Sequence, residues 1–149
     1  MNLPFVKRRK FFSQADEQKI IDAIKAAEKN TSGEIRVHIE PTCNGHPYER
    51  ALEVFGQLAM HKTAQRNGVL FYLATADHKF TVFGDKGINE KVPFGFWDGV
   101  KDLMQTRFRE GDFVGGLSEA ILMAGEQLKA HFPYQSGDKN ELSDEISQG

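Results

Sequence analysis

The segment of residues 67–85, NGVLFYLATADHKFTVFGD, predicts two β-strands joined by a tight turn. Its apolar run from Val69 to Ala74 is nearly continuous, which is typical of a central strand covered on both faces. The polar stretch ATADHK then indicates a hairpin turn, and KFTVFGD supplies the second strand. Because the connection is short, the second strand must run antiparallel to the first. This hairpin is the expected centre of the sheet.

A further strand is predicted upstream, at residues 31–41. Its sequence, TSGEIRVHIEP, alternates apolar and polar residues until Pro41 stops it. Apolar residues at helical spacing within residues 48–63 predict a helix between this strand and the one that begins at Val69. The strand, the helix and the next strand form a β-α-β unit, in which the two strands are parallel and the crossover is right-handed.

Three more helices are predicted, at residues 13–30, 94–111 and 112–133. Together the elements predict an α/β fold, a three-layer α/β/α sandwich with a small mixed central sheet and helices on both faces. We expect one domain at residues 12–134, preceded by an N-terminal extension at residues 1–11. Residues 135–149 are polar and show no periodicity, so they are expected to form a disordered tail.

The composition excludes several classes of protein. With 19 basic and 21 acidic residues the net charge is −2, so no general field favours nucleic acid as a partner. No window offers the roughly 18 apolar residues that a membrane span needs. The single cysteine, Cys43, excludes an internal disulfide framework and a multi-cysteine metal site. The N-terminus lacks the apolar stretch of a secretory signal, so a soluble, cytoplasmic protein is expected.

Three oxygen-bearing side chains, Glu34, Asn67 and Asp85, are predicted to meet at one edge of the sheet. The two parallel strands begin at this edge, and the antiparallel strand ends there. Each of the three residues lies next to a glycine. Hard divalent cations, Ca²⁺ above all, bind carboxylate and carbonyl oxygens at such a rim. The sequence therefore suggests a calcium site. The alternative is purely structural, because Asp and Asn beside Gly are the commonest turn residues.

Several motifs together resemble the TPM domain family: SGEIRVHI at residues 32–39, NGVLFYLATADHKFTVFGDKGI at 67–88, FREGDFVGGL at 108–117 and HFP at 131–133. The family includes small stand-alone bacterial proteins, which this chain resembles most, and the thylakoid lumen acid-phosphatase-like proteins. The resemblance runs from about Phe12 to Pro133 and marks residues 12–134 as a TPM-like domain. It implies a central sheet between helices, with a divalent metal, usually calcium, at one end of the sheet.

The family's acidic positions match Glu34 and Asp85 of this chain, and Asn67 matches the Asn of the family's Asn-Gly-Val. Many members carry an Asp immediately before that Asn. This chain has Arg66 there, which removes one possible oxygen ligand.

Three functions remain as expectations. The first is a divalent-metal-binding domain, with calcium as the first candidate, that acts as a binding or accessory module. The second is a weak metal-dependent acid phosphatase, as described for a plant relative, in which Arg36, Arg66 or Lys86 would meet phosphate oxygens. The third is a metal-free module that binds an unknown protein partner. No P-loop, G-x-S-x-G or H-E-x-x-H motif is present, so no catalytic residue is assigned.

Two further side chains are candidates for chemistry. His38 lies on the polar face of the strand at residues 31–41 and suits a metal ligand or an acid/base group, although such histidines are more often surface residues. Cys43 is a candidate nucleophile, but no histidine and carboxylate are evidently arranged around it, so an incidental thiol is favoured.

Overall fold

The computed structural model describes residues 11–134 and 144–149. The helices and strands follow one another along the chain in this order: α1 (Gln14–Glu28), β1 (Glu34–Glu40), α2 (Pro47–Gln57), the 3₁₀ helix η1 (Met60–Lys62), β2 (Gly68–Ala74), β3 (Lys79–Gly84), α3 (Lys86–Asn89), α4 (Phe96–Arg109), α5 (Phe113–His131) and β4 (Ser147–Gln148).

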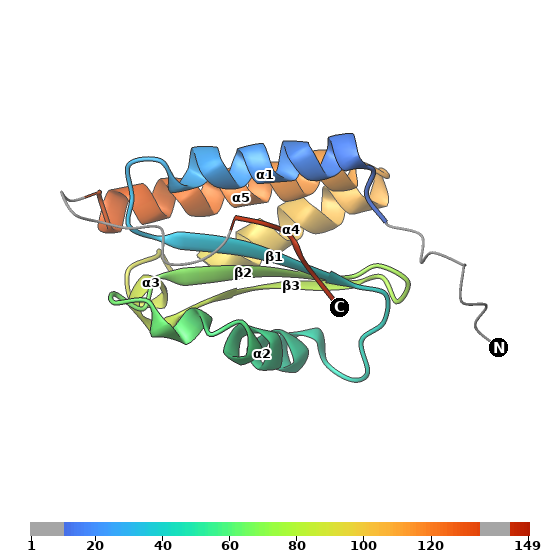
Figure 1. Ribbon diagram of the computed structural model, residues 1–149, viewed down its shortest axis with the longest axis horizontal. Coiled ribbons are helices and arrows are strands. Elements are labelled where there is room, and N and C mark those ends of the chain that lie inside the picture. Colours follow the sequence, from blue (N-terminus) through green and yellow to red (C-terminus); the bar gives the residue numbers. More distant parts are fainter. Residues whose placement is uncertain (1–10, 135–143) are drawn as a thin grey trace.

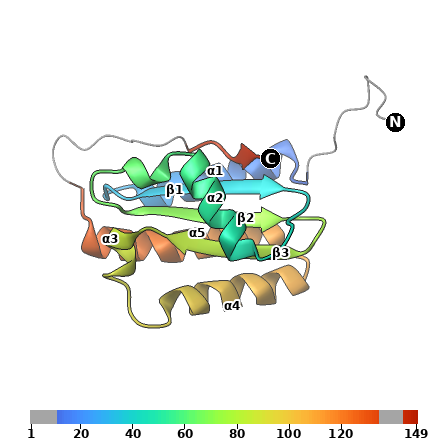
Figure 2. The ribbon, with the colours of Figure 1, turned by 90° about the horizontal axis from the view of Figure 1, so that it is seen from below.

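The elements form three layers around one sheet. Helices α1, α4 and α5 lie on one side, and α2 crosses the opposite side (Figure 1). Seen from below, α2 lies across the face of the sheet, whereas α4 runs along the side nearest β3 (Figure 2). The predicted α/β/α sandwich with a small mixed sheet is confirmed. No helix in the described ranges is long and apolar enough to cross a membrane.

The sheet has the strand order β3-β2-β1-β4. β1 and β2 are parallel, with Glu34 opposite Gly68 and Glu40 opposite Ala74. β2 and β3 are antiparallel, with Val69 opposite Gly84. Every residue of β2 is buried, as the continuous apolar run predicted for a central strand. Both the hairpin and the parallel crossover therefore agree with the sequence analysis.

Two details differ from the sequence-based expectations. The helix predicted over residues 48–63 ends at Gln57, and Ala59 adopts a left-handed conformation (φ 57°) before the short η1 turn. Ser147 and Gln148, within the segment expected to be a disordered tail, form β4 and pair in parallel with His38 and Ile39 of β1. A strand of two polar residues leaves no periodic pattern to detect. Residues 135–143 of that expected tail lie outside the described residues.

The sheet separates two apolar clusters. The larger one lies between the sheet and α1, α4 and α5, and includes Ile35 and Val37 of β1 and Phe71 of β2. The smaller one contains Leu70 and Tyr72 of β2 together with the apolar side of α2. Because side chains alternate along a strand, the remaining residues of β1 present a polar row on the α2 side of the sheet: Glu34, Arg36, His38 and Glu40.

Helices α1 and α5 pack closely because Gly125 lacks a side chain. A Cβ atom at Gly125 would lie 2.6 Å from the Cβ atom and 2.7 Å from the Cα atom of Ala27. Such distances are well inside ordinary contact, so any larger residue at Gly125 must push the two helices apart.

We predict that Gly125→Ala lowers the free energy of unfolding by about 1–3 kcal/mol, because it overpacks the α1–α5 contact. Gly56→Ala is the matched control, since Gly56 lies inside α2 and a Cβ atom added there would have no neighbour within 4 Å. This control should raise stability by about 0.5–1 kcal/mol, because alanine is the better helix former. Urea unfolding monitored by circular dichroism measures both changes. Equal effects of the two substitutions would contradict the close packing.

Candidate functional site

The backbone brings Glu34, Asn67 and Asp85 to one end of the sheet, as the strand order predicted. Glu34 lies opposite Gly68, and its N–H donates to the carbonyl of Asn67 (3.4 Å). The N–H of Asp85 donates to the carbonyl of Gly68 (2.9 Å). All three residues are buried, with exposed fractions of 3%, 1% and 3%. We refer to these three residues and Arg66 as the edge site.

Arg66 binds Asp85 through both arms of its guanidinium. Its Nε donates to Oδ2 at 2.8 Å, and its terminal nitrogen donates to Oδ1 at 3.0 Å. The ion pair raises the pKa of Arg66, because the Asp85 carboxylate stabilises the charged guanidinium. The Asp85 side chain is 4% exposed, whereas that of Arg66 is 50% exposed. A buried carboxylate is thus neutralised by a cation that reaches it from the surface.

Asp85 also has a structural role, which was the alternative interpretation of the sequence. It is the N-cap of α3, and its Oδ1 accepts the N–H of Lys86 at 2.7 Å. Together with the two bonds from Arg66, this contact engages both carboxylate oxygens. Capping and charge pairing therefore act on the same side chain.

The glycines beside Asp85 permit close approach of other segments. A Cβ atom at Gly87 would collide with the carbonyl oxygen of Gln65 and would lie 2.6 Å from that of Arg66. The N–H of Gly87 donates to the latter at 2.8 Å. On the other side of Asp85, a Cβ atom at Gly84 would lie 2.6 Å from the ring of Trp97. Gly87 thus allows the loop that carries Arg66 to lie against the start of α3, and Gly84 allows Trp97 to approach β3.

Ser32 links the two loops at this end of the sheet. Its hydroxyl accepts hydrogen bonds from Gln65 Nε2 at 3.0 Å and from Asn67 Nδ2 at 3.2 Å. The Asn67 N–H donates to Thr63 Oγ1 at 3.3 Å. These bonds orient the amide of Asn67 and hold residues 65–67 next to the start of β1. The sequence analysis did not identify Ser32 or Gln65.

The arrangement of the edge site bears directly on the predicted metal. Both oxygens of Asp85 accept hydrogen bonds from protein donors while Arg66 is in place. Within residues 11–134 and 144–149, no three His, Cys, Asp or Glu side chains are grouped as metal ligands. The edge site as described does not fit a divalent cation. It suits one only when the guanidinium of Arg66 has moved away from Asp85.

The sequence matches a known family of proteins over most of its length. A family model for the TPM domain matches residues 5–127. The chain belongs to the TPM domain family. No curated protein matches the chain.

Solved structures share this fold of the TPM domain. The BA42 protein from the psychrophilic bacterium Bizionia argentinensis sp. nov., solved by NMR, is 45% identical, with a TM-score of 0.87, over 96% of this chain and 99% of that protein. The N-terminal domain of a P. gingivalis protein is 22% identical, with a TM-score of 0.68, over 83% of this chain and 82% of that one. The N-terminal domain of cg2496 from Corynebacterium glutamicum is 13% identical, with a TM-score of 0.65, over 89% and 84%. The last two share the fold alone.

A further carboxyl group, Glu28, lies near the edge site of this TPM domain. Its Oε2 accepts the N–H of Ile35 at 2.8 Å. Burial raises the pKa of Glu28 well above the usual range of a carboxyl, and a hydrogen bond with Asp144 and the nearby charge of Glu34 add to this shift. Burial and these neighbours therefore favour the protonated form of Glu28. No sequence pattern indicated this, because Glu28 is simply the last residue of α1.

At the other end of β1, Glu40 is the centre of a polar network. Its carboxylate accepts bonds from Arg50 Nε (2.9 Å) and a terminal nitrogen of Arg50 (3.0 Å), and from the hydroxyl of Tyr72. His38 Nε2 lies 3.0 Å from Glu40 Oε1, and His38 Nδ1 lies 3.0 Å from Ser147 Oγ. Arg50, followed by Tyr72 and His38, lowers the pKa of Glu40 to about 2.

This network gives both of the other candidate side chains a structural setting. His38 is buried and joins Glu40 to β4, so its ring helps to hold the end of the chain against β1. Cys43 is buried as well, and its N–H donates to Asp77 Oδ2 at 2.8 Å. A buried thiol with these surroundings is consistent with the favoured interpretation of Cys43 as incidental.

We predict that Glu28→Gln makes stability less dependent on pH. The pKa of Glu28 is higher in the folded chain than its unfolded value of 4.5, so its contribution is complete below about pH 4.5 and is lost as pH rises. The native chain should lose up to about 1.4 kcal/mol per pH unit from this group, and the Gln variant should not. Urea unfolding at pH 5 and pH 8 tests this, with exposed Glu126→Gln as the control. Identical pH dependence of all three proteins would refute the assignment.

We further predict that Glu40→Gln lowers the free energy of unfolding by about 2 kcal/mol at pH 7, because Arg50 loses its charged partner. The folded pKa of Glu40 is about 2 and its unfolded value is 4.5, so its contribution is present above about pH 4.5 and is lost as pH falls towards 2. The difference between variant and native chain should therefore shrink at pH 3. Urea unfolding at pH 7 and at pH 3 measures both differences.

Glu53→Gln is the control for Glu40→Gln. It removes the exposed partner of Arg50 and should change stability by less than about 0.5 kcal/mol. An equal loss of stability in the two variants would contradict the central place of Glu40 in the network.

Proposed function

We propose that this TPM domain is a binding module that takes a divalent cation, with calcium as the first candidate, at the edge site. The observation that best supports the proposal is the guanidinium of Arg66 on the buried carboxylate of Asp85. Because the chain places its own cation, Arg66, against Asp85, the groups around Asp85 favour a positive charge there. A divalent cation would take its place in exchange for Arg66, with Glu34, Asn67 and Asp85 as the side chains that hold it.

Arg66 is suited to such an exchange. Its side chain is half-exposed, and within the described residues both hydrogen bonds of the guanidinium go to Asp85. It belongs to the loop between η1 and β2 rather than to a helix or strand. The guanidinium can therefore turn into solvent without uncovering the apolar core, whereas Asp85, Glu34 and Asn67 remain in place at the end of the sheet.

The contact between Arg66 and Asp85 also predicts that calcium binds weakly. Calcium must compete with the guanidinium of Arg66, which the fold holds next to Asp85, so the apparent affinity for calcium is reduced by that competition. Calcium prefers six to eight oxygen ligands in a flexible arrangement, and the three side chains supply only part of this number. Water would complete the coordination. A low-affinity site of this kind suits an accessory or sensing role at high calcium concentration.

The phosphatase alternative gains no support from the cationic side chains considered for it. Arg66 is engaged with Asp85, and a terminal nitrogen of Arg36 lies 3.4 Å from the carbonyl oxygen of Glu145. Lys86 is beside Asp85 at the start of α3. The arrangement therefore favours cation binding over hydrolysis, and we assign no catalytic residue.

The exchange can be tested by titrating the full chain with CaCl₂ and following backbone amides by NMR. We expect saturable shifts at residues 33–34, 67 and 84–87 at millimolar calcium in the native chain. Arg66→Asp should bind at least about tenfold more tightly, because it removes the competing cation and adds a carboxylate. Asp85→Asn should abolish the shifts.

Lys19→Asp is the control for net charge, since Lys19 is exposed on α1 and is not part of the edge site. It changes the charge as much as Arg66→Asp and should leave calcium binding unaltered. No shift in either the native chain or Arg66→Asp at 10 mM calcium, or equal gains from Arg66→Asp and Lys19→Asp, would overturn the proposal.

A further inference from the structure

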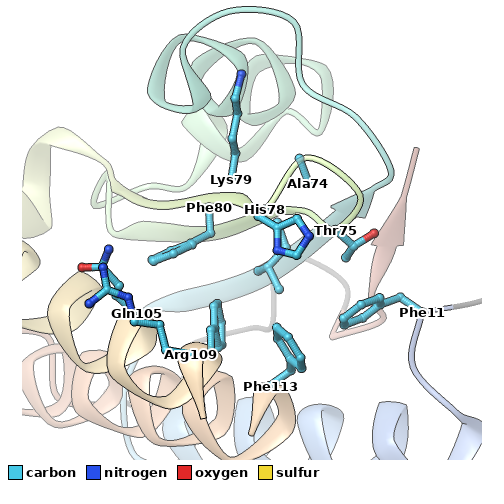
Figure 3. A pocket seen from close by; sticks show the side chains of 11 residues that line it. Phe11, Ala74, Thr75, His78, Lys79, Phe80, Gln105, Arg109 and Phe113 are labelled. Atoms are coloured by element: carbon cyan, nitrogen blue, oxygen red, sulfur yellow. The ribbon is translucent and has the colours of Figure 1, made fainter. Parts of the chain in front are cut away.

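A cleft with a volume of about 420 Å³ opens at the opposite end of the sheet from the edge site. It lies between the β2–β3 hairpin, the end of α4 and the start of α5 (Figure 3). We refer to it as the aromatic cleft. Its walls are mostly apolar side chains from separate segments, namely Phe11, Leu73, Ala74, Phe80, Phe108 and Phe113.

Four phenylalanine rings form a continuous wall in the aromatic cleft. The ring centres of Phe80 and Phe108 are 5.0 Å apart, those of Phe108 and Phe113 are 5.3 Å apart, and those of Phe113 and Phe11 are 5.2 Å apart. Their planes are inclined to one another, at 73°, 35° and 85°. Such a wall offers ring edges and faces to a flat apolar group, which aromatic molecules prefer as neighbours.

The charged residues that line the aromatic cleft, Lys79 and Arg109, are both basic. No Asp or Glu of the described residues lines it, although the whole chain has a net charge of −2. Arg109 stands at one side of the opening, next to Gln105, and His78 and Thr75 stand at the other (Figure 3).

Among the described residues, Arg109 is a charged residue of the aromatic cleft whose guanidinium is free to pair with a ligand. Both residues 105 and 109 are exposed at the surface of α4. Two positions earlier on the same helix, Arg107 is paired with Glu119 at 3.2 Å, but within the described residues no ion pair or hydrogen bond involves the Arg109 side chain. Lys79, in contrast, donates to the carbonyl oxygens of Cys43 and Gly45. Figure 3 shows its amine pointing away from the cleft.

We propose that the aromatic cleft binds a small aromatic carboxylate. Its volume is within the range of small-molecule sites, roughly 300–1,000 Å³, and is too small for a folded partner. The flat apolar body would lie against the Phe80, Phe108 and Phe113 rings. The carboxylate would meet Arg109, whose planar guanidinium matches two carboxylate oxygens. This site is separate from the edge site and does not depend on calcium.

The test uses 2-naphthoate as the probe and neutral 2-naphthamide as its matched analogue, each titrated into the ¹⁵N-labelled full chain. We expect 2-naphthoate to shift amides of residues 73–80 and 105–113, and to bind at least about fivefold more tightly than the amide, because only the acid can pair with a guanidinium. Absence of shifts at 2 mM probe, or equal affinities of acid and amide, would overturn the proposal.

Two variants and one control test whether Arg109 binds the carboxylate and whether the probes occupy the aromatic cleft. Arg109→Gln should weaken 2-naphthoate about fivefold, to the level of 2-naphthamide, and should leave 2-naphthamide unchanged. Lys101→Gln, also on α4, should leave both affinities unchanged. Gln105→Trp places a bulky ring at the exposed opening and should weaken both probes. If Arg109→Gln has no effect on 2-naphthoate, the proposed partner of the carboxylate is wrong.

A third probe distinguishes a flat body from an extended chain. Decanoate carries the same carboxylate on a flexible alkyl chain, so below its aggregation limit it should bind more weakly than 2-naphthoate to the inclined phenylalanine wall. Tighter binding of decanoate would overturn the assignment of an aromatic ligand.

Discussion

Strand β2 is paired on both sides and buried on both faces, and the rest of the molecule is arranged around it. Its parallel partner, β1, starts where β2 starts, and its antiparallel partner, β3, ends there. One end of the sheet therefore collects loop residues from three strands. The other end carries the tight hairpin turn and the residues that follow it. The polar edge site and the aromatic cleft thus lie at opposite ends of one buried strand.

Burial of acidic groups is an electrostatic cost of this arrangement, and the chain meets it in two ways at three residues. Asp85 is paired with Arg66, Glu40 is paired with Arg50, and burial raises the pKa of Glu28, which favours its protonated form. Which of the two applies depends on whether a cation lies nearby, since a buried carboxyl group either pairs with a cation or becomes neutral. The pair of Arg50 and Glu40 also connects α2 to β1, whereas the pair of Arg66 and Asp85 connects the loop before β2 to the start of α3.

The backbone layout was predictable from the sequence, because long apolar runs and a short connection leave few choices of topology. The meeting of Glu34, Asn67 and Asp85 followed from that layout alone. The role of Arg66 did not. On sequence it was a missing ligand, whereas in the structure it is the cation that binds Asp85. That contact depends on the close approach of the loop to Gly87, which no periodic pattern encodes. The aromatic cleft was equally hidden, because its rings come from separate segments and meet only in three dimensions.

The backbone at position 66 limits which residues the loop before β2 can accept. Arg66 is one of a few described residues other than glycine in the left-handed region, with φ of 52°, and the packing of Gly87 fixes the loop in that shape. Aspartate and asparagine enter the left-handed region more readily than most residues. The loop can therefore carry aspartate in place of the arginine at position 66 with the same backbone conformation. Replacement of Arg66 by aspartate can therefore exchange the counterion of Asp85 for a second acidic side chain, while the backbone of the loop keeps its conformation.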